Sequence, residues 1–495
     1  MRDRLAQASF WLASAKFLNN FLSAFSTIIL AWILVPEDFG IVALASAFIL
    51  VASSVTELSL GEALINVEKP EHAHLHTVWT LSILRSLLVS LVLSVAAHPV
   101  AVAAHDLRIE PVLYVLLAGL GISGFTSPRL AMLERNLQFK QAFALSLASN
   151  TVTFAVTIIL ALVFRNYWAI ALGSVAGQIG KVIASYLIAP YGPRLSWSKA
   201  QELWRFSVWL SLSQIVSTLN YRADQLMVGW MLGRAELGYY TVGGRIAQTP
   251  GREVVAPLTA TLYPALVMLR DDRDRLLRGY VRAQTLVTFI ALPVTSLVAL
   301  FAHPTIRFLL GEHWMGAVLV IQTVAASTAF ETLGGIVTPL AMAQGQTDVL
   351  FRRDLLKLCL RLPMILVGLV LGGLTGLLIA RSAAGLLSAL IDILLVKSLI
   401  GLSLLRQLRH NMRCLTATAA MAVMAIVMQE IVPDVASRGL QFARLALLGT
   451  SSVAVFILVA ALLWRVSRYA DGPEGEILGL FQSGTRKLGS SKQPG

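Results

Sequence analysis

The sequence predicts an all-α integral membrane protein with about 14 transmembrane helices. Of its 495 residues, 56% are hydrophobic and only 14% are charged, and the apolar residues come in runs of about 20. A soluble domain is roughly a quarter charged, so charge is too sparse here to cover soluble surfaces. A helix of about 20 residues, rising about 1.5 Å per residue, is long enough to cross a hydrocarbon core of about 30 Å.

The spans are placed from the apolar runs and from the short polar connections between them. No segment resembles a linker to a soluble domain, and the polar tail at 465–495 is expected to be a mostly disordered cytoplasmic segment. The expected spans are 9–35, 38–64, 77–103, 111–133, 141–164, 167–190, 206–232, 238–267, 280–302, 314–342, 349–371, 373–397, 413–432 and 440–464.

The formal net charge of +13 reflects membrane topology rather than nucleic-acid binding. If the N-terminus is cytoplasmic, the inner loops and the tail hold roughly 26 Lys and Arg residues, as the positive-inside rule expects. The outer loops hold only Arg108, Arg165, Arg234, Arg307 and Arg438. Both termini are therefore predicted to be cytoplasmic.

An internal repeat is the clearest sign of domain organisation. LVPEDFG at 34–40 matches LGRAELG at 232–238, the two His-Pro pairs begin at His98 and His303, and Ser127-Pro128 matches Thr338-Pro339. Three anchors in the same order indicate two six-helix halves in one orientation, related by a pseudo-twofold axis near the membrane normal. The predicted parts are an N-terminal lobe at 1–190, a C-terminal lobe at 206–397, and two extra helices at 413–464.

Four motifs carry a family resemblance. They are VPEDFG at the start of 35–64, LERNLQFKQAF at 133–143, Asp224-Gln-Leu-Met-Val-Gly229 followed by Leu237-Gly-Tyr-Tyr240, and Gly311-Glu-His-Trp314. With them the chain resembles, over about residues 1 to 345, the Wzx-type polysaccharide transporters of the multidrug/oligosaccharidyl-lipid/polysaccharide flippase superfamily, a subgroup that includes colanic acid exporters. Beyond about residue 350 the chain is typical in length but not in motif.

The resemblance implies a V-shaped bundle of two lobes around a central cavity. It implies alternating access that moves an undecaprenyl-diphosphate-linked oligosaccharide across a bacterial inner membrane, for exopolysaccharide, capsule or O-antigen synthesis. The implied partners are this lipid-linked cargo, membrane lipids, and a polymerase with a chain-length regulator. No cofactor and no nucleic acid is implied.

Charged residues inside the spans are the candidate functional residues, because one at a helix centre costs roughly 2.5–3.5 kcal/mol. Eight are positive and five are negative, a balance that suits an anionic cargo such as a diphosphate. Helical spacing adds polar neighbours on the faces of two of these residues, Lys16 and Arg252. The predicted cargo contacts are Lys16, Asn19, Asn20, Arg85, Arg222, Arg245, Gln248, Arg252, Arg361 and Arg381.

Each of these residues also has a structural interpretation. Lys16 and Arg85 can snorkel to the membrane surface, and the other charges can pair between spans. Glu57 and Asp224 are candidates for carrying a coupling proton or sodium ion, although structural pairing is favoured for both. The alternating His72, His74 and His76 are interpreted as an exposed linker rather than a metal site.

Two other functions stay open at this stage. A cation-coupled multidrug exporter of the same superfamily would favour a cavity richer in Asp and Glu, so the surplus of arginine counts against it. A membrane glycosyltransferase or polymerase would need large loops with acidic catalytic residues, and the internal loops here are short. The sequence offers no catalytic constellation, so the protein is predicted not to be an enzyme.

Overall fold

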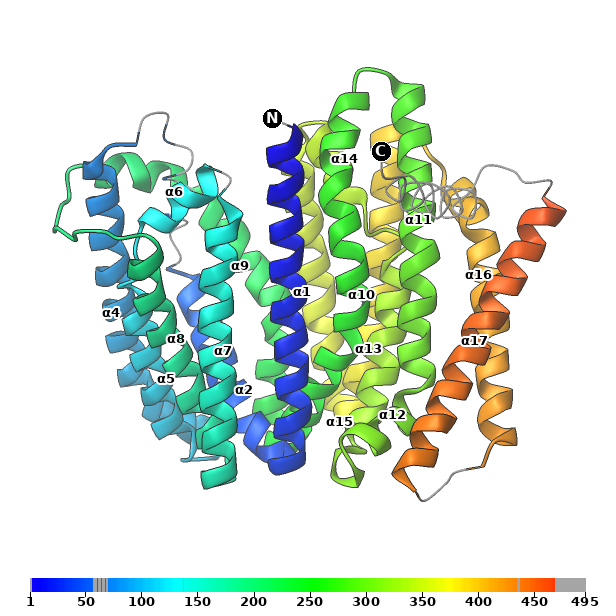
Figure 1. Ribbon diagram of the computed structural model, residues 1–495, viewed down its shortest axis with the longest axis horizontal. Coiled ribbons are helices and arrows are strands. Elements are labelled where there is room, and N and C mark those ends of the chain that lie inside the picture. Colours follow the sequence, from blue (N-terminus) through cyan, green and yellow to red (C-terminus); the bar gives the residue numbers. More distant parts are fainter. Residues whose placement is uncertain are drawn as a thin grey trace, which may run out of the picture. The chain divides into compact units, whose positions relative to one another are not determined.

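The computed structural model describes residues 2–56, 60, 64, 67, 70–136, 138–433 and 437–467, and every regular element within them is a helix. Figure 1 shows that, within each compact part of the chain, the helices run mostly parallel or antiparallel to one another. Their bounds are α1 Arg2–Ile33, α2 Pro36–Ser54, α4 His72–Ala103, α5 Ile109–Ser123, α6 Arg129–Arg135, α7 Phe139–Phe164, α8 Trp168–Ile188, α9 Ala200–Met231, α10 Arg234–Leu269, α11 Arg273–Leu300, α12 Ala302–Leu309, α13 Ala317–Glu331, α14 Val337–Ala343, α15 Thr347–Ile400, α16 Leu404–Ile431 and α17 Arg438–Val466, with a 3-10 turn at Glu312–Trp314.

The structure confirms the predicted all-helical membrane fold. Among the described residues, eight helices are long and apolar enough to cross a membrane. Three shorter apolar helices lie at Leu18–Ile33, Ile109–Ser123 and Ala317–Glu331. Each expected span contains helical residues, and the count of about 14 stays a prediction. The predicted tail lies outside the described residues from 468 onward.

Two expected spans are interrupted. The span at 111–133 is divided into α5 and α6, and the span at 314–342 is divided into α13 and α14. The first interruption lies before Pro128, whose ring disfavours helical backbone at the preceding residue, and the second contains Gly334 and Gly335. Both segments are apolar enough to look continuous, so hydropathy alone does not reveal these breaks.

The chain reverses within α15 without a loop. Gly372 and Gly373 have non-helical backbone angles, and Gly373 has a φ of +57°, which a residue with a Cβ rarely adopts. The reversal lies where the sequence predicts one span to end at 371 and the next to begin at 373. The helix therefore consists of two arms.

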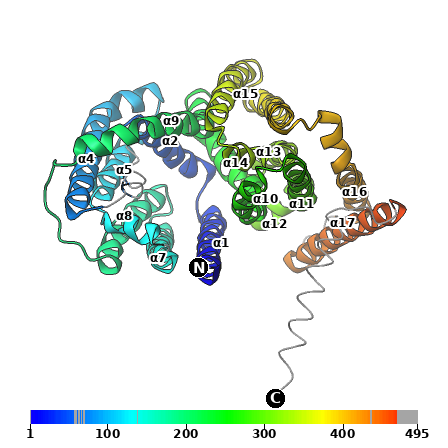
Figure 2. The same ribbon diagram turned by 90° about the horizontal axis from the view of Figure 1, so that it is seen from above.

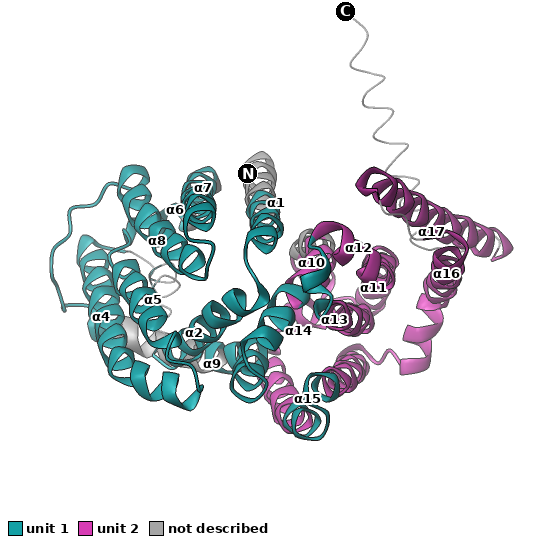
Figure 3. Ribbon diagram, turned by 90° about the horizontal axis from the view of Figure 1, so that it is seen from below, with its two compact units in different colours: residues 1–243, 310–317, 365–377 teal, residues 244–309, 318–364, 378–495 magenta. Residues whose placement is uncertain are grey.

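The chain forms two compact units, coloured in Figure 3. Unit 1 contains residues 1–243, 310–317 and 365–377, and unit 2 contains 244–309, 318–364 and 378–495. In unit 1, α7 packs against α1 and α8, and α2 packs against α5 and α9. In unit 2, α16 packs against α11 and α17, and Figures 1 and 2 both show α17 beside α16. The predicted lobe boundaries stay a prediction.

The two matched hairpins of the sequence repeat are in direct backbone contact within unit 1. A Cβ built on Gly40 would lie 1.9 Å from the Arg234 carbonyl oxygen. A Cβ built on Gly238 would lie 1.9 Å from the Pro36 carbonyl oxygen. Pro36 and Arg234 are the first residues of α2 and α10, and both glycines follow four residues later. The two hairpins therefore meet on one side of unit 1, and the repeat itself stays a prediction.

Trp314 fills the space beside these hairpins. Its side chain is fully buried, and its Nε1 donates a hydrogen bond to the Ala31 carbonyl at 2.9 Å. The rings of Phe39 and Tyr239 pack edge-on against it, with centroid distances of 5.2 and 6.1 Å. The aromatic residues of three sequence motifs therefore form one cluster.

Replacing either hairpin glycine is expected to destabilise the protein, because the added methyl group would overlap a backbone carbonyl that cannot move aside. We expect Gly40→Ala and Gly238→Ala each to lower the stability by about 1–3 kcal/mol, the usual cost of overpacking. Thermal unfolding of the purified protein in detergent measures this. Gly439→Ala is the control, because no atom lies within 4 Å of its built Cβ. Equal unfolding temperatures for all three variants would refute the close contact.

Candidate functional site

A polar face on α10 brings together three of the predicted cargo contacts. Arg245 and Arg252 are exposed, and Arg252 Nη2 donates a hydrogen bond to Gln248 Oε1. The opposite face of α10 packs closely on its neighbours: Ala247 is fully buried, and a Cβ built on Gly251 would lie 2.7 Å from Thr295 Cγ2 of α11. The predicted polar face is therefore turned away from the helix packing of unit 2.

A second group of charges lies where α13 meets the two arms of α15. Lys357 Nζ, on the first arm, contacts both carboxylate oxygens of Asp392, on the second arm, at 2.7 and 2.8 Å. Arg353 lies 3.6 Å from the same carboxylate and 2.7 Å from Asp354. These contacts join the arms by ion pairs at a largely buried position. Lys357 and Asp392 were not among the predicted cargo contacts.

The predicted contacts Arg361 and Arg381 belong to the same group. Both lie within electrostatic range of the Glu331 carboxylate, which ends α13. Glu331 is exposed, and a Cβ built on Gly385 would lie 3.3 Å from its Oε1. The positive charges of Arg361 and Arg381 are therefore partly balanced by a carboxylate that belongs to the protein.

The predicted polar face of α1 is only partly described. Asn19 Oδ1 accepts a hydrogen bond from Asn150 Nδ2 of α7 at 2.7 Å, which joins the two helices. Asn20 is half-buried. The side chain of Lys16 lies outside the described residues, as does Glu57. Their proposed roles stay predictions.

Arg85 has a structural contact that the sequence pattern did not predict. Its Nε and Nη2 donate to the carbonyl oxygens of Thr56 and Ser53, at 2.7 and 3.0 Å. These carbonyls lie at the C-terminal end of α2, where helix carbonyls lack intrahelical partners and the helix dipole favours a cation. Arg85 therefore caps α2, and a cargo contact would have to compete with this role.

Two further candidates lie on α9. Arg222 donates to Gln225 Oε1 at 3.1 Å, one turn along the same helix. Asp224 is almost fully buried, and its Oδ2 accepts a hydrogen bond from the hydroxyl of Tyr240 at 2.8 Å. The Tyr240 contact explains why the Asp224 motif is followed by a Leu-Gly-Tyr-Tyr sequence, and it favours the structural interpretation of Asp224.

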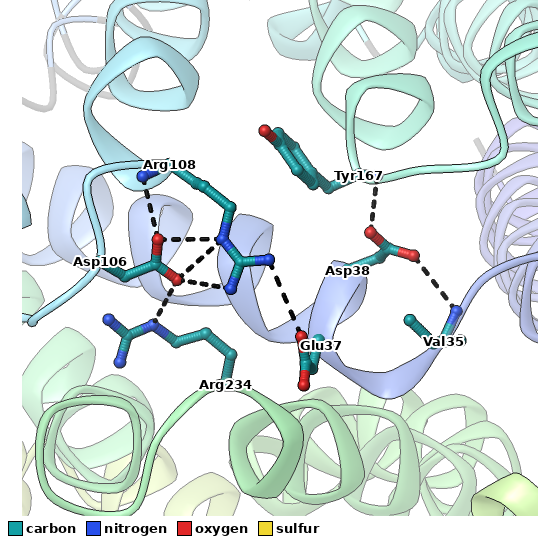
Figure 4. Close-up of polar contacts among 7 residues, drawn as sticks. All are labelled: Val35, Glu37, Asp38, Asp106, Arg108, Tyr167 and Arg234. Carbon is teal, nitrogen blue, oxygen red and sulfur yellow. Dashed lines mark hydrogen bonds and ion pairs between the residues drawn. The ribbon is translucent and has the colours of Figure 1, made fainter.

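The ion network drawn in Figure 4 lies around the matched hairpins. Asp106 accepts hydrogen bonds from the Arg108 side chain at 2.9 and 3.0 Å, and its Oδ2 lies 3.4 Å from Arg234 Nε. Arg234 also donates to the Gly229 carbonyl at 3.2 Å and to that of Ala104. The network therefore connects the α4–α5 loop to the start of α10. It is extended by Arg108, which lies 3.8 Å from Glu37 of α2.

Burial and charge act against each other in this network. Burial works to raise the pKa of Asp106, but the hydrogen bonds and positive charge of Arg108 outweigh it and lower that pKa. Burial lowers the pKa of Arg234, whose side chain is only 9% exposed, and Asp106 partly offsets this effect. The sequence does carry a signal for this network, because Arg108 lies two residues after Asp106 and Arg234 lies in the hairpin at 232–238, and both are among the few predicted outer cations.

Asp38 holds the first hairpin in place through two hydrogen bonds. Its Oδ2 accepts a hydrogen bond from the Val35 N–H at 3.2 Å, and its Oδ1 accepts one from the Tyr167 N–H at 2.9 Å. The first contact caps α2 and the second ties the α7–α8 loop to it (Figure 4). Pro36 occupies the first helical position, where its missing N–H is not needed.

Metal binding has no support among the residues that the structure describes. Within them, no three His, Cys, Asp or Glu side chains lie together in a way that could hold an ion. His74 Nδ1 accepts a hydrogen bond from the Glu71 N–H, and His76 contacts the Tyr191 hydroxyl at 2.5 Å. The prediction of an exposed linker here is wrong: the three histidines begin α4, His74 is buried, and the His72 and His76 rings lie 6.5 Å apart. Neither of the two cysteines, Cys359 and Cys414, is in a disulfide.

Long apolar helices, eight of which among the described residues could cross a membrane, define an integral membrane protein. The chain belongs to the polysaccharide biosynthesis protein family, whose model matches residues 29–319. This confirms the family resemblance predicted from the motifs.

Individual relatives agree with this family. The chain is 19% identical to the lipopolysaccharide biosynthesis protein WzxC of Escherichia coli K12, over 81% of this chain and 83% of that protein. It is 25% identical to the succinoglycan biosynthesis transport protein ExoT of Rhizobium meliloti, over 70% of each chain. It is 20% identical to the teichuronic acid biosynthesis protein TuaB of Bacillus subtilis, over 76% of this chain and 78% of that protein.

Solved structures show the same fold. The lipid II flippase MurJ, in an inward closed conformation, has a TM-score of 0.75 at 14% identity, with 92% of this chain and 99% of that chain covered. A multidrug resistance MATE family transporter of the MOP superfamily, in an inward-facing conformation, has a TM-score of 0.58 at 14% identity, with 81% and 95% covered. The predicted fold class is thereby confirmed.

Removing the charge of Asp106 is expected to destabilise the hairpin network, because Arg234 would stay buried without its carboxylate. We expect Asp106→Asn to lower the stability by roughly 1–3 kcal/mol at neutral pH. Because the folded pKa of Asp106 is lowered, its contribution is complete above the ordinary value of 3.8 and is lost as the pH falls through the folded value.

Thermal unfolding at several pH values measures the difference between Asp106→Asn and the unmodified protein. The difference should shrink on acidification below about pH 4. A difference that does not depend on pH would show that Asp106 contributes by shape rather than by charge.

Proposed function

We propose that this protein is a flippase that moves undecaprenyl-diphosphate-linked oligosaccharide repeat units across a bacterial inner membrane. The cargo would pass from the cytoplasmic leaflet to the outer leaflet, for exopolysaccharide, capsule or O-antigen synthesis. Family membership and the named transport relatives support transport of a polysaccharide precursor. The fold shared with a lipid II flippase supports a cargo that is itself a lipid. Both termini are proposed to be cytoplasmic.

The exposed arginine face of α10 is the observation that carries the proposal. Arg245 and Arg252 are seven residues apart, so their Cα atoms lie about 10.5 Å apart along the axis. Arginines inside a membrane protein are costly to expose to lipid, so they are expected to face water or a ligand. The guanidinium group binds phosphate oxygens through two parallel hydrogen bonds, which suits a diphosphate. The protein is therefore proposed to hold its cargo by the diphosphate at this face.

Alternating access requires one side of the bundle to close while the other is open. The matched hairpins at 34–40 and 232–238 lie on the predicted outer side. Their backbone contact at Gly40 and Gly238, together with the Asp106–Arg234 pair, supplies a closure there. Release of cargo to the outer leaflet would require this contact to open. A polymerase and a chain-length regulator are the proposed partners that receive the cargo.

A cation-coupled multidrug exporter is the second candidate, because MATE transporters share the fold. Cationic drugs would be repelled by Arg245 and Arg252, so the charge of the exposed face favours the flippase. The two functions differ in a deletion strain. Loss of the flippase should block polymer export without changing drug susceptibility, whereas loss of an exporter should raise susceptibility alone.

Arg252 is expected to be necessary for transport. Arg252→Ala should reduce polymer export at least tenfold and make lipid-linked repeat units accumulate inside the cell, because a contact to the diphosphate is lost. Complementation of a deletion strain, with membrane levels of the protein measured in parallel, tests this. Arg438→Ala is the matched control, since Arg438 is exposed at the start of α17. Normal export by a strain with Arg252→Ala would remove Arg252 from the cargo site.

A further inference from the structure

Glu331 occupies an electrostatically unfavourable position. It is the last residue of α13, at an interruption inside an apolar segment. The C-terminal end of a helix carries partial negative charge, so a carboxylate there is destabilising unless cations compensate it. The cations of the α15 arms supply that compensation, since Arg381, Arg361 and Lys357 all lie within electrostatic range.

The packing of α13 on α15 fixes where this carboxylate lies. Ser327 Oγ contacts Ser382 Oγ at 3.1 Å, and Glu331 lies one turn further along α13, beside Gly385. Arg381 precedes Ser382 on the same arm. Arg361 lies one turn beyond Lys357, which is bound to Asp392 on the facing arm. Glu331 is therefore within electrostatic range of one arginine from each arm of α15.

The charges here separate into a closed part and an open part. In the closed part, Asp392 is largely buried and forms ion pairs with Lys357 and Arg353. In the open part, Glu331 is exposed, and its Oε1 packs closely on Gly385, where a built Cβ would lie 3.3 Å from it. An anion that reaches the open part meets Arg361 and Arg381 together with a negative charge that is already there.

We propose that Glu331 is a specificity residue that sets a charge threshold for anions at Arg361 and Arg381. This proposal rests on the proposed function, in which the cargo carries a diphosphate. Ordinary anionic phospholipids such as phosphatidylglycerol carry one negative charge on a phosphodiester. A diphosphate that links a lipid to a sugar carries two. The Glu331 carboxylate, with one negative charge, competes on equal terms with a phosphodiester for the two arginines. A diphosphate, with two negative charges, displaces it.

This threshold addresses a problem that any arginine site in a membrane has. Phospholipid headgroups greatly outnumber lipid-linked repeat units, and an uncompensated pair of arginines would be filled by them. With Glu331 in place, a phosphodiester gains little by displacing an equal charge. A diphosphate gains from its second charge and from bidentate contacts to two guanidinium groups.

Transport in vesicles of defined composition tests the proposal. The experiment uses the unmodified protein and three variants, Glu331→Gln, Glu331→Asp and Glu430→Gln. Each is placed in phosphatidylethanolamine vesicles that contain either no phosphatidylglycerol or about 30 mol% of it. The transported probe is an undecaprenyl-diphosphate oligosaccharide, detected by a lectin outside the vesicle. Glu430 is the control because it is an exposed carboxylate in the same unit.

Phosphatidylglycerol should leave transport by the unmodified protein, Glu331→Asp and Glu430→Gln unchanged. It should reduce transport by Glu331→Gln by about tenfold, because a neutral amide no longer competes with the phosphodiester. Equal sensitivity of Glu331→Gln and the unmodified protein overturns the proposal. So does an equal loss of transport by Glu331→Gln in both lipid mixtures, which indicates a structural role.

A second measurement separates this proposal from the proposed function. Native mass spectrometry counts phosphatidylglycerol molecules that stay bound to each purified variant, and Glu331→Gln should retain at least one more than the unmodified protein. If no variant moves the probe, the proposed function fails, and the count of bound lipids decides the role of Glu331 by itself. If Glu331→Gln does not fold, strong inhibition of the unmodified protein by phosphatidylglycerol overturns the proposal.

Discussion

The close approach of two helix-starting hairpins is the constraint on which the rest of unit 1 depends. Gly40 and Gly238 let the α2 and α10 backbones meet at a distance that no side chain tolerates. Around this contact, Trp314 receives Phe39 and Tyr239, and the start of α10 is tied to the α4–α5 loop by Arg234. Four segments that are distant in sequence are thereby held at one place. The family motifs mark packing residues as much as transport residues.

Hydropathy and motif spacing predicted the membrane fold, the family and the positions of most helices. They succeeded because a bilayer requires long apolar helices, and because the hairpins need particular residues such as Pro36 and Gly40. They failed at the interruption between α13 and α14, since Thr332–Ile336 is as apolar as the helices on either side. A window that averages over a whole span does not detect a break of one turn.

The candidate site was predicted in part. Helical spacing placed Arg245, Gln248 and Arg252 on one face, and the structure brings the latter two into contact. Charge alone did not distinguish Arg85, which caps α2, from a residue available to cargo. That distinction depends on which carbonyl groups lie nearby, and such contacts join residues about 30 positions apart. The same reason explains why the Lys357–Asp392 pair was not anticipated.

The sharp reversal within α15 has a mechanical consequence. Its arms are joined at one end by Gly372 and Gly373, without a loop, and further along by the clasp of Lys357 and Asp392. With two attachments along their length, the arms have no slack to slide past each other. The two arms are expected to tilt as one rigid body. A displacement at one end would then move Arg361 and Arg381 together.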